Sequence, residues 1–271
     1  MKKNQIVIET KRKLFANRVG NHSSIFGGSG IEFKDIRGYT TSDSARHINW
    51  RKSTRDSVKV NTFNEDRELN IAIIYLNSGS LNFANKKDKA IEALTALSFA
   101  SVYSKEALAT IFFNNKEQLF LKPTKKAEAV DINYQFANTL KCQSSIDYEE
   151  LTKYIFHHIK RRSIVFIIGD FLDEVDLQEI SKVHETYCLI IRAKAEENLE
   201  LLGELNIKDL NSNELTQLNI DKRSQKVYNK LFKKQYTQLL KHLHNCQIKF
   251  TKIYTDDNSV NKIKEVLDAK Y

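Results

Sequence analysis

The chain has 271 residues, of which 41% are hydrophobic and 28% are charged, so it is long enough for one large globular domain with an extra segment. One proline and eight glycines argue against disordered linkers, collagen-like repeats and a turn-rich β-sandwich. The net charge of +9 favours an anionic partner such as nucleic acid, anionic lipid or an acidic protein surface.

The sequence predicts a cytoplasmic protein without a transmembrane segment. No window holds the roughly 18 consecutive apolar residues that a membrane-spanning helix needs. The N-terminus has scattered charges and lacks the apolar region of a signal peptide. Cys142, Cys188 and Cys246 are far apart and show no CxxC spacing, so we expect buried, reduced thiols.

The first third of the chain changes from a helical pattern to a strand pattern. Residues 3–18 have helical periodicity, and a polar stretch with a glycine cluster follows at 22–43. The alternation in SVKVNTF predicts a half-exposed strand at 57–63. The apolar run LNIAIIYL at 69–76 predicts a strand that is covered on both faces.

The remaining elements alternate between strands and amphipathic helices. We expect helices at 86–105, 125–140, 147–161, 175–184, 221–245 and 259–269. We expect strands at 107–113 and 118–123, which form a hairpin, at 163–171, 186–193 and 246–255, and a short hairpin or edge strand at 214–220. This order predicts an α/β fold with a mostly parallel central sheet and helices on both faces, of the Rossmann type. Residues 67–271 form the main domain, and residues 1–66 an N-terminal helix, loop and strand extension packed on it.

Polar residues follow two of the buried strands, where parallel α/β sheets bind ligands. Ser78 and Ser80 follow the first strand, and Asp170 follows the second. Two hydroxyls and a carboxylate are ligands that Mg²⁺ accepts. Alternatively, the serines cap the following helix and Asp170 accepts from backbone amides in its turn.

The sequence contains no nucleophile and base in a recognisable arrangement. Neither an HExxH motif nor a GxSxG motif is present, so we expect no enzymatic activity. A weaker alternative is a metal-dependent hydrolase that uses Asp170 with Asp173 and Asp176.

The long helix at 221–245 has two distinct faces, and Asp221 can cap it. One stripe is apolar and the opposite side is basic, with Tyr228, Phe232, Tyr236, Leu239 and Leu243 on the first and Lys226, Lys230, Lys233 and Lys241 on the second. The helix therefore either packs on the core with a solvated basic side, or binds a nucleic-acid backbone through residues 222–245.

The segment Gly30–Arg55 is dense in charged and aromatic residues and contains the single tryptophan, Trp50. It either covers one end of the sheet or forms a recognition patch, because Arg, Tyr and Trp commonly anchor interfaces.

The run GIEFKDIRGYTTSDSARHINWRKSTR in this segment resembles the signature of the domain of unknown function 58 family. The matching positions are Gly30, Glu32, Phe33, Arg37, Tyr39, Asp43, Arg46, Ile48, Trp50, Ser53 and Arg55. The chain differs at Thr41-Ser42, Ser44 and Asn49, where the family has Pro-Gly, Asp and Asp.

The resemblance implies a von Willebrand factor A-like domain that works with a MoxR-type AAA ATPase in the assembly or maturation of other proteins. Many family members carry two N-terminal membrane helices, and this chain resembles the short soluble type. The expected partner-binding residues are Glu32, Arg37, Tyr39, Asp43, Arg46, Trp50 and Arg55, with Trp50 packing the segment on the main domain. The sequence identifies neither the ATPase, the client protein nor the oligomeric state.

The resemblance also implies a degenerate metal-ion-dependent adhesion site. Ser78, Ser80 and Asp170 match the A-domain pattern, but Leu76 stands at the first aspartate and Ile146 at the threonine. Since Mg²⁺ sheds its water reluctantly, we expect weak or absent Mg²⁺ binding and no other cofactor.

Overall fold

The computed structural model describes residues 32–40, 48–54, 57–64, 70–197, 203–208 and 215–268. Two compact units are present, one within Gly27–Glu68 and the other from Leu69 onward. The helix predicted at residues 3–18 lies outside the described residues, and the predicted division at residues 66 and 67 stays a prediction. No helix in the described ranges has both the length and the apolar composition needed to cross a membrane.

The first unit is built on an antiparallel pair of strands, β1 (Glu32–Gly38) and β2 (Lys59–Asn64). The strand β2 overlaps the strand predicted at 57–63, whereas β1 lies in the stretch expected to be a loop, so that prediction is wrong. The register of the pair shifts between Phe33 and Asp35, which marks a bulge. Phe33 and Ile36 are three positions apart, so the sequence lacks the strict alternation by which a strand is recognised.

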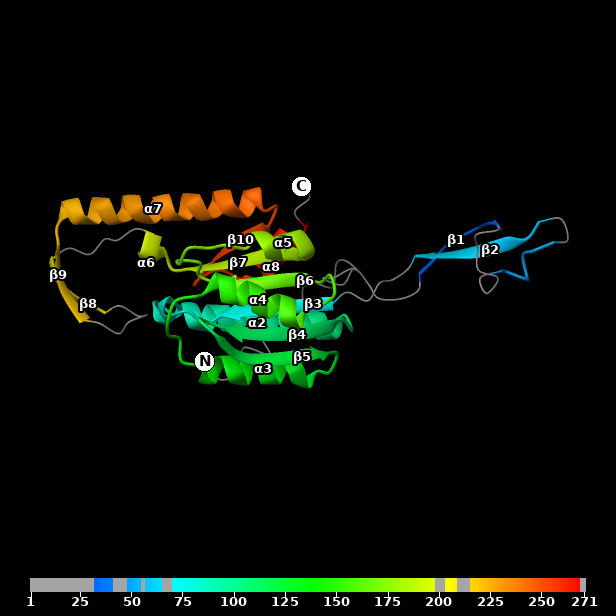
Figure 1. The fold of residues 1–271 in the computed structure, drawn as a ribbon, viewed down its shortest axis with the longest axis horizontal. Helices are drawn as coiled ribbons and strands as arrows, with labels where there is room; N and C mark the ends of the chain where they lie inside the picture. The colour runs from blue at the N-terminus through cyan, green and yellow to red at the C-terminus, as the bar shows by residue number, and fades with distance from the viewer. Residues whose placement is uncertain are drawn as a thin grey trace. The chain divides into compact units, whose positions relative to one another are not determined.

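The second unit has a six-stranded sheet in the order β10-β7-β6-β3-β4-β5 (Figure 1). Its strands are β3 (Asn70–Leu76), β4 (Ala107–Phe113), β5 (Glu117–Thr124), β6 (Ile164–Gly169), β7 (Glu185–Arg192) and β10 (Lys249–Tyr254). All neighbours in this sheet are parallel except β4 and β5, which form the predicted hairpin. Numbered within the sheet, the order is 3-2-1-4-5-6, that of doubly wound folds. The predicted α/β fold with a mostly parallel sheet is confirmed.

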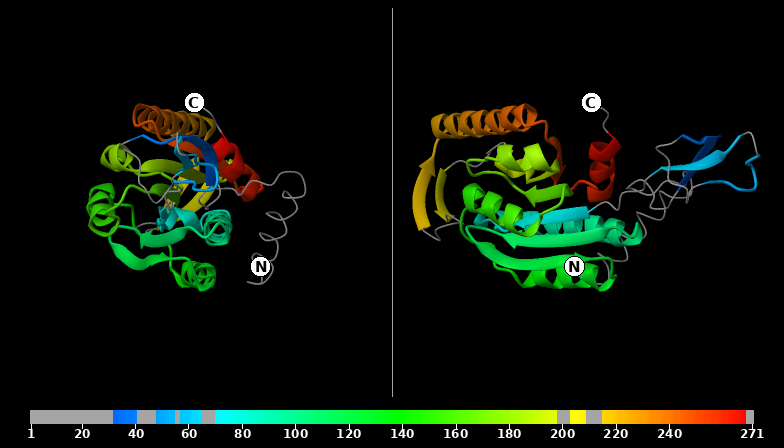
Figure 2. Two further views of the ribbon diagram at one scale, coloured as in Figure 1. Left: turned by 90° about the vertical axis from the view of Figure 1, so that its right-hand side faces the viewer. Right: turned by 45° about the vertical axis from the view of Figure 1, so that its right-hand side comes forward.

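Helices cover both faces of this sheet, as the left view of Figure 2 shows. Helices α2 (Lys86–Tyr103), α3 (Glu128–Thr139) and α8 (Ser259–Asp268) pack on one face. Helices α4 (Tyr148–His158), α5 (Gln178–Val183) and α7 (Lys222–Asn245) pack on the other. Shorter elements are the 3-10 helix η2 (Gly79–Asn82), helix α6 (Lys194–Glu197) and a separate antiparallel pair, β8 (Gly203–Lys208) and β9 (Leu215–Ile220).

The strand β3 shows why its sequence is continuously apolar. Ile71, Ile73 and Tyr75 belong to the core cluster under α2, while Ala72 and Ile74 belong to the cluster under α4. Because successive side chains point to opposite faces, a strand covered on both sides must be apolar at every position. Each large aliphatic side chain so buried contributes roughly 1.5–3 kcal/mol of transfer free energy.

Candidate functional site

The candidate site lies at the carboxyl edge of the main sheet, between β3 and β6. These strands are neighbours in the sheet but are separated in the chain by β4 and β5. Ligands of doubly wound sheets bind where the strand order reverses in this way. Ser78 follows β3 and Asp170 follows β6, so the fold brings these two predicted residues together.

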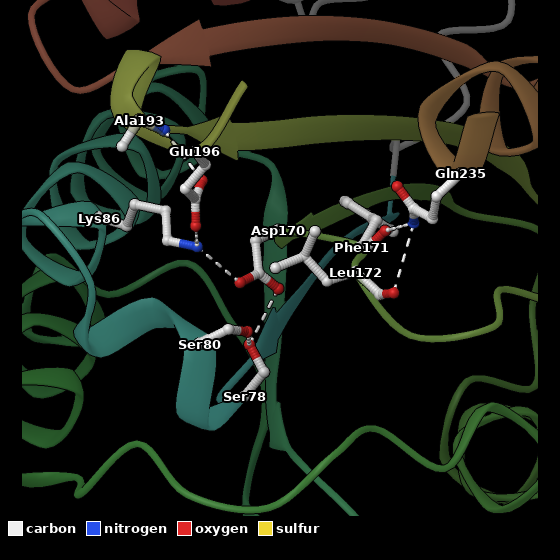
Figure 3. Close-up of polar contacts among 9 residues, drawn as sticks. All are labelled: Ser78, Ser80, Lys86, Asp170, Phe171, Leu172, Ala193, Glu196 and Gln235. Carbon is white, nitrogen blue, oxygen red and sulfur yellow. Dashed lines mark hydrogen bonds and ion pairs between the residues drawn. The ribbon is translucent and has the colours of Figure 1, made fainter. Parts of the chain in front are cut away.

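The two serines and Asp170 form a hydrogen-bonded chain (Figure 3). The Ser78 hydroxyl donates to Oδ1 of Asp170 at 3.0 Å, and the Ser80 hydroxyl donates to the Ser78 oxygen at 3.1 Å. Ser78 is the N-cap residue of η2, but its side chain makes no capping hydrogen bond. The alternative in which Ser78 caps the helix is therefore wrong, because its hydroxyl is directed at Asp170.

A fourth residue, Lys86, completes the site and was missed by the sequence reasoning. Its ammonium donates to Oδ2 of Asp170 at 3.0 Å, and its side chain has no solvent-exposed surface. Lys86 is the first residue of α2, and helical periodicity places it in line with Ala90 and Leu94 of the buried stripe. A lysine in register with an apolar stripe is the signal that could have identified it.

Glu196 of α6 is the second carboxylate at this ammonium. Its Oε1 accepts from the Lys86 ammonium, and its Oε2 accepts from the backbone N–H of Ala193 at 3.2 Å. Glu196 is buried and follows β7, so Lys86 connects the ends of β6 and β7 to the start of α2 (Figure 3). No pattern in the sequence pairs Lys86 with Glu196, which are 110 positions apart.

The surroundings keep Asp170 ionised. Burial by itself raises the pKa of this carboxyl, but the Lys86 ammonium, the Ser80 hydroxyl and Arg192 outweigh burial, so the pKa lies below its ordinary 3.8. Asp170 therefore carries a full negative charge in the folded protein, and Lys86 compensates it directly.

The two positions that depart from the metal-site pattern are both apolar and buried. Leu76 and Ile146 are 1% and 8% exposed, and both belong to the core cluster that contains Phe171. A Cβ added at Gly169 would lie 3.0 Å from both Cβ and Cδ1 of Leu76, which shows how closely Leu76 fills the end of β6. Hydrocarbon therefore fills these two positions, where the metal-site pattern has oxygen ligands.

This donor set does not fit a divalent cation. Hydroxyl and carboxylate oxygens suit Mg²⁺ when waters complete its shell, but Asp170 already accepts from the Lys86 ammonium, which would repel a second cation at the same carboxylate. In the part of the chain that the structure describes, no group of three or more His, Cys, Asp or Glu residues could hold a metal ion.

Asp173 and Asp176 do not join the site. Asp173 accepts from the backbone N–H of Ile146 at 2.9 Å, and Asp176 accepts from that of Gln178 at 3.1 Å. Burial, with a contribution from Asp170, raises the pKa of Asp173 despite that hydrogen bond. Both carboxylates stabilise loops, so the structure offers no support for the alternative of a hydrolase built on them.

The loop after Asp170 is attached to α7. Phe171 has a left-handed φ of 50°, and the side-chain amide of Gln235 donates to its carbonyl at 2.9 Å. Arg192, at the end of β7, is fully buried, and its guanidinium lies 5.3 Å from the ring centre of Phe232 and 5.9 Å from that of Tyr236. Its three guanidinium nitrogens have no hydrogen-bond partner among the described residues.

The segment Gly30–Arg55 is described only in part. Glu32 and Arg37 lie on β1, and Tyr39 follows it, whereas Asp43, Arg46 and Arg55 lie outside the described residues. Trp50 and Tyr39 are 75% and 40% exposed. The packing of Trp50 on the main domain stays a prediction.

The strand order and the place of the site define an α/β protein of the doubly wound class, with the von Willebrand factor A-like arrangement predicted from the sequence. Within this class, the chain belongs to the family described as "Protein of unknown function DUF58", whose family model matches residues 35–238. No curated protein matches the sequence.

Several solved structures are similar to this chain at low sequence identity. The conserved hypothetical protein BatB from Bacteroides thetaiotaomicron is 10% identical, with 73% of this chain and 97% of that chain covered and a TM-score of 0.47. The von Willebrand factor type A protein from Catenulispora acidiphila is 10% identical, with 78% and 44% covered and a TM-score of 0.44. The SpRpn10 VWA domain is 9% identical, with 73% and 94% covered and a TM-score of 0.40.

Proposed function

We propose that the chain is a non-enzymatic protein-interaction module that acts with a MoxR-type AAA ATPase in the assembly or maturation of other proteins. Membership of the DUF58 family supports an interaction module. The observation that carries the proposal is the exposure of Trp50, because tryptophan is among the side chains most enriched at the energetic centres of interfaces.

Backbone hydrogen bonds hold the segments that carry exposed apolar side chains against residues 58 and 59. The N–H of Tyr39 donates to the carbonyl of Val58 at 2.8 Å, and the N–H of Asn49 donates to that of Lys59 at 2.8 Å. Trp50 follows Asn49 in the chain, and Tyr39 and Val58 are 40% and 36% exposed. We call Tyr39, Trp50 and Val58 the hairpin patch.

Exposed cations surround the hairpin patch, namely Arg37, Arg51, Lys52 and Lys59. Apolar anchors within a basic rim suit a protein surface that has an apolar pocket with acidic residues around it. A charged rim increases the rate of association and sets its specificity, while the buried anchors supply most of the affinity.

We propose as part of the same function that the chain has no catalytic activity. At the candidate site, Asp170, Lys86 and Glu196 bond to one another and are buried, which leaves no acid or base of this group open to a substrate. In this proposal the chain works in the cytosol, where its free thiols Cys142, Cys188 and Cys246 stay reduced.

The test is capture of a purified MoxR-type ATPase from the same organism, measured by biolayer interferometry. Trp50→Ala should weaken capture by about 30-fold, the effect of a hot spot worth about 2 kcal/mol. Tyr103→Ala is the matched control, since Tyr103 is an aromatic residue of α2 that is 45% exposed. Equal capture by wild type and Trp50→Ala would show that the hairpin patch is not the interface. No capture by the wild type would show that the ATPase partnership is wrong.

A second candidate function is nucleic-acid binding by α7. The helix contains seven Lys and Arg residues and no Asp or Glu, and all seven are exposed, namely Lys222, Arg223, Lys226, Lys230, Lys233, Lys234 and Lys241. Affinity that arises from phosphate contacts falls steeply with salt. Replacing Lys230 and Lys234 by Glu should reduce DNA affinity at about 50 mM salt and flatten its salt dependence. Absence of binding by the wild type at this salt would remove the candidate.

A further inference from the structure

We infer that Lys86 is the built-in cation of the candidate site, where its ammonium performs the charge-neutralising role that a divalent ion has in a metal-dependent adhesion site. The inference concerns the chemistry of the sheet edge and does not depend on the identity of any partner.

The first support is the position of the ammonium. It contacts Oδ2 of Asp170, while Oδ1 of the same carboxylate accepts from Ser78. The carboxylate is thus shared between a cation on one side and the serine chain on the other (Figure 3). This carboxylate and these hydroxyls are the groups that the sequence pattern assigned to a metal.

The second support is the charge of the site. Two buried carboxylates, Asp170 and Glu196, face one ammonium in direct contact, and Arg192 supplies a second buried positive charge that acts on Asp170. Two negative and two positive charges balance without an added ion. A divalent cation would leave a net charge of about +2 in a buried place, which is costly in a low-dielectric interior.

The third support is that buried apolar side chains occupy two positions where the metal-site pattern has oxygen ligands. Leu76 and Ile146 belong to one apolar cluster. A water could take the place of either missing oxygen ligand only if this part of the core opened. Compared with the metal-site pattern, the site lacks one ligand carboxylate and one ligand hydroxyl, and it has an ammonium beside the carboxylate that remains.

An ordinary buried ion pair makes a different prediction from a substitute for a metal. If the Lys86 ammonium formed an ion pair at a place that no metal ion could take, its removal would destabilise the protein without making it respond to metals. If the ammonium takes the ion's role, its removal leaves two carboxylates and two hydroxyls free to bind a divalent cation. Whether a protein without the Lys86 ammonium responds to a divalent cation therefore distinguishes an ordinary ion pair from a substitute for a metal.

The experiment measures Mn²⁺ binding by electron paramagnetic resonance and Mn²⁺-dependent melting, with the full chain. Wild type should show no saturable binding and no shift in Tm at about 5 mM Mn²⁺. Lys86→Met should bind Mn²⁺, and its Tm should rise by about 5 to 10 °C at a hundredfold excess over Kd. Adding Asp170→Asn to Lys86→Met should abolish the response.

Lys89→Met is the matched control. Lys89 is also a buried lysine of α2 and pairs with Glu92 at 2.8 Å, but it lies outside the serine chain, so its loss should give no Mn²⁺ response. Because Lys86→Met leaves buried charges unpaired, it is refolded both with and without Mn²⁺, and more folded protein with Mn²⁺ is the expected result. A Lys86→Met protein that gains nothing from Mn²⁺, whether folded or unfolded, overturns the inference. Saturable Mn²⁺ binding by the wild type that Ser78→Ala/Ser80→Ala removes also overturns it.

Discussion

The hairpin patch and the sheet edge differ in whether their functional candidates are exposed or buried. At the hairpin patch, Trp50 is 75% exposed, so its burial contributes little to stability. At the sheet edge, Lys86 and Asp170 are buried and satisfy each other. The polar residues at the end of the sheet therefore contribute mainly to the stability of the domain, whereas Tyr39, Trp50 and Val58 of the small unit lie on its accessible surface.

The strongest test of this contrast is the stability of Lys86→Met. Removing the ammonium leaves the buried carboxylates of Asp170 and Glu196 without the cation that they share, so the free energy of unfolding should fall by about 3–5 kcal/mol. Urea unfolding followed by circular dichroism measures this change. Lys194→Met, which breaks the exposed pair with Asp256, should leave the unfolding midpoint unchanged. Similar small effects of both changes would contradict the stabilising role of the sheet edge.

A smaller loss is expected when the packing of Leu76 is disturbed. Gly169→Ala places a methyl group 3.0 Å from Cβ and Cδ1 of Leu76, so strand β6 or Leu76 must move. Overpacking of this kind typically costs about 1–3 kcal/mol, measurable by thermal or urea unfolding. In a Leu76→Ala background, Gly169→Ala should cost less than it does in the wild type, and an equal cost would place the strain elsewhere.

Acid should weaken the sheet edge through Asp170. Since the pKa of this carboxyl is lower in the folded protein than its ordinary 3.8, its stabilising contribution is complete above pH 3.8 and is lost as the pH falls through the folded-state pKa. The loss amounts to at most about 1.4 kcal/mol per pH unit for one group. Unfolding free energies between about pH 5 and 2.5 should show a shallower slope for Asp170→Asn than for wild type. Equal slopes would mean that Asp170 does not titrate in this way.

The smallest effect on stability is expected from Trp50→Ala. Because the residue is largely exposed, the free energy of unfolding should change by no more than about 0.5 kcal/mol, although partner capture should fall. A large destabilisation would show that Trp50 is packed in solution and would restore the expectation drawn from the sequence.

Much of the fold could be predicted, since burial on two faces leaves a clear mark on a sequence. The runs that became β3 and β6 are apolar at nearly every position, and helices between them have a period of 3.6. Strand β1 could not be predicted in this way because its bulge separates Phe33 and Ile36 by an odd number of positions.

The candidate site could be predicted only where the residues follow a strand end. Ser78 and Asp170 are recognisable from this position and from the family resemblance. Glu196 is not recognisable in this way, and Lys86 is marked only by its register with the apolar stripe of α2. A lysine at a helix start usually extends into solvent, and only the folded sheet shows that the ends of β3, β6 and β7 converge on Lys86.

A cation that is part of the polypeptide is supplied once, when the chain is made. One ammonium is present for every molecule, and its local concentration does not change with dilution, chelators or the magnesium content of the cell. On the inference drawn above, the sheet edge is set at synthesis and its charge does not depend on ion supply. In the function proposed above, control over the partner acts through another variable, such as the partner's nucleotide state or abundance.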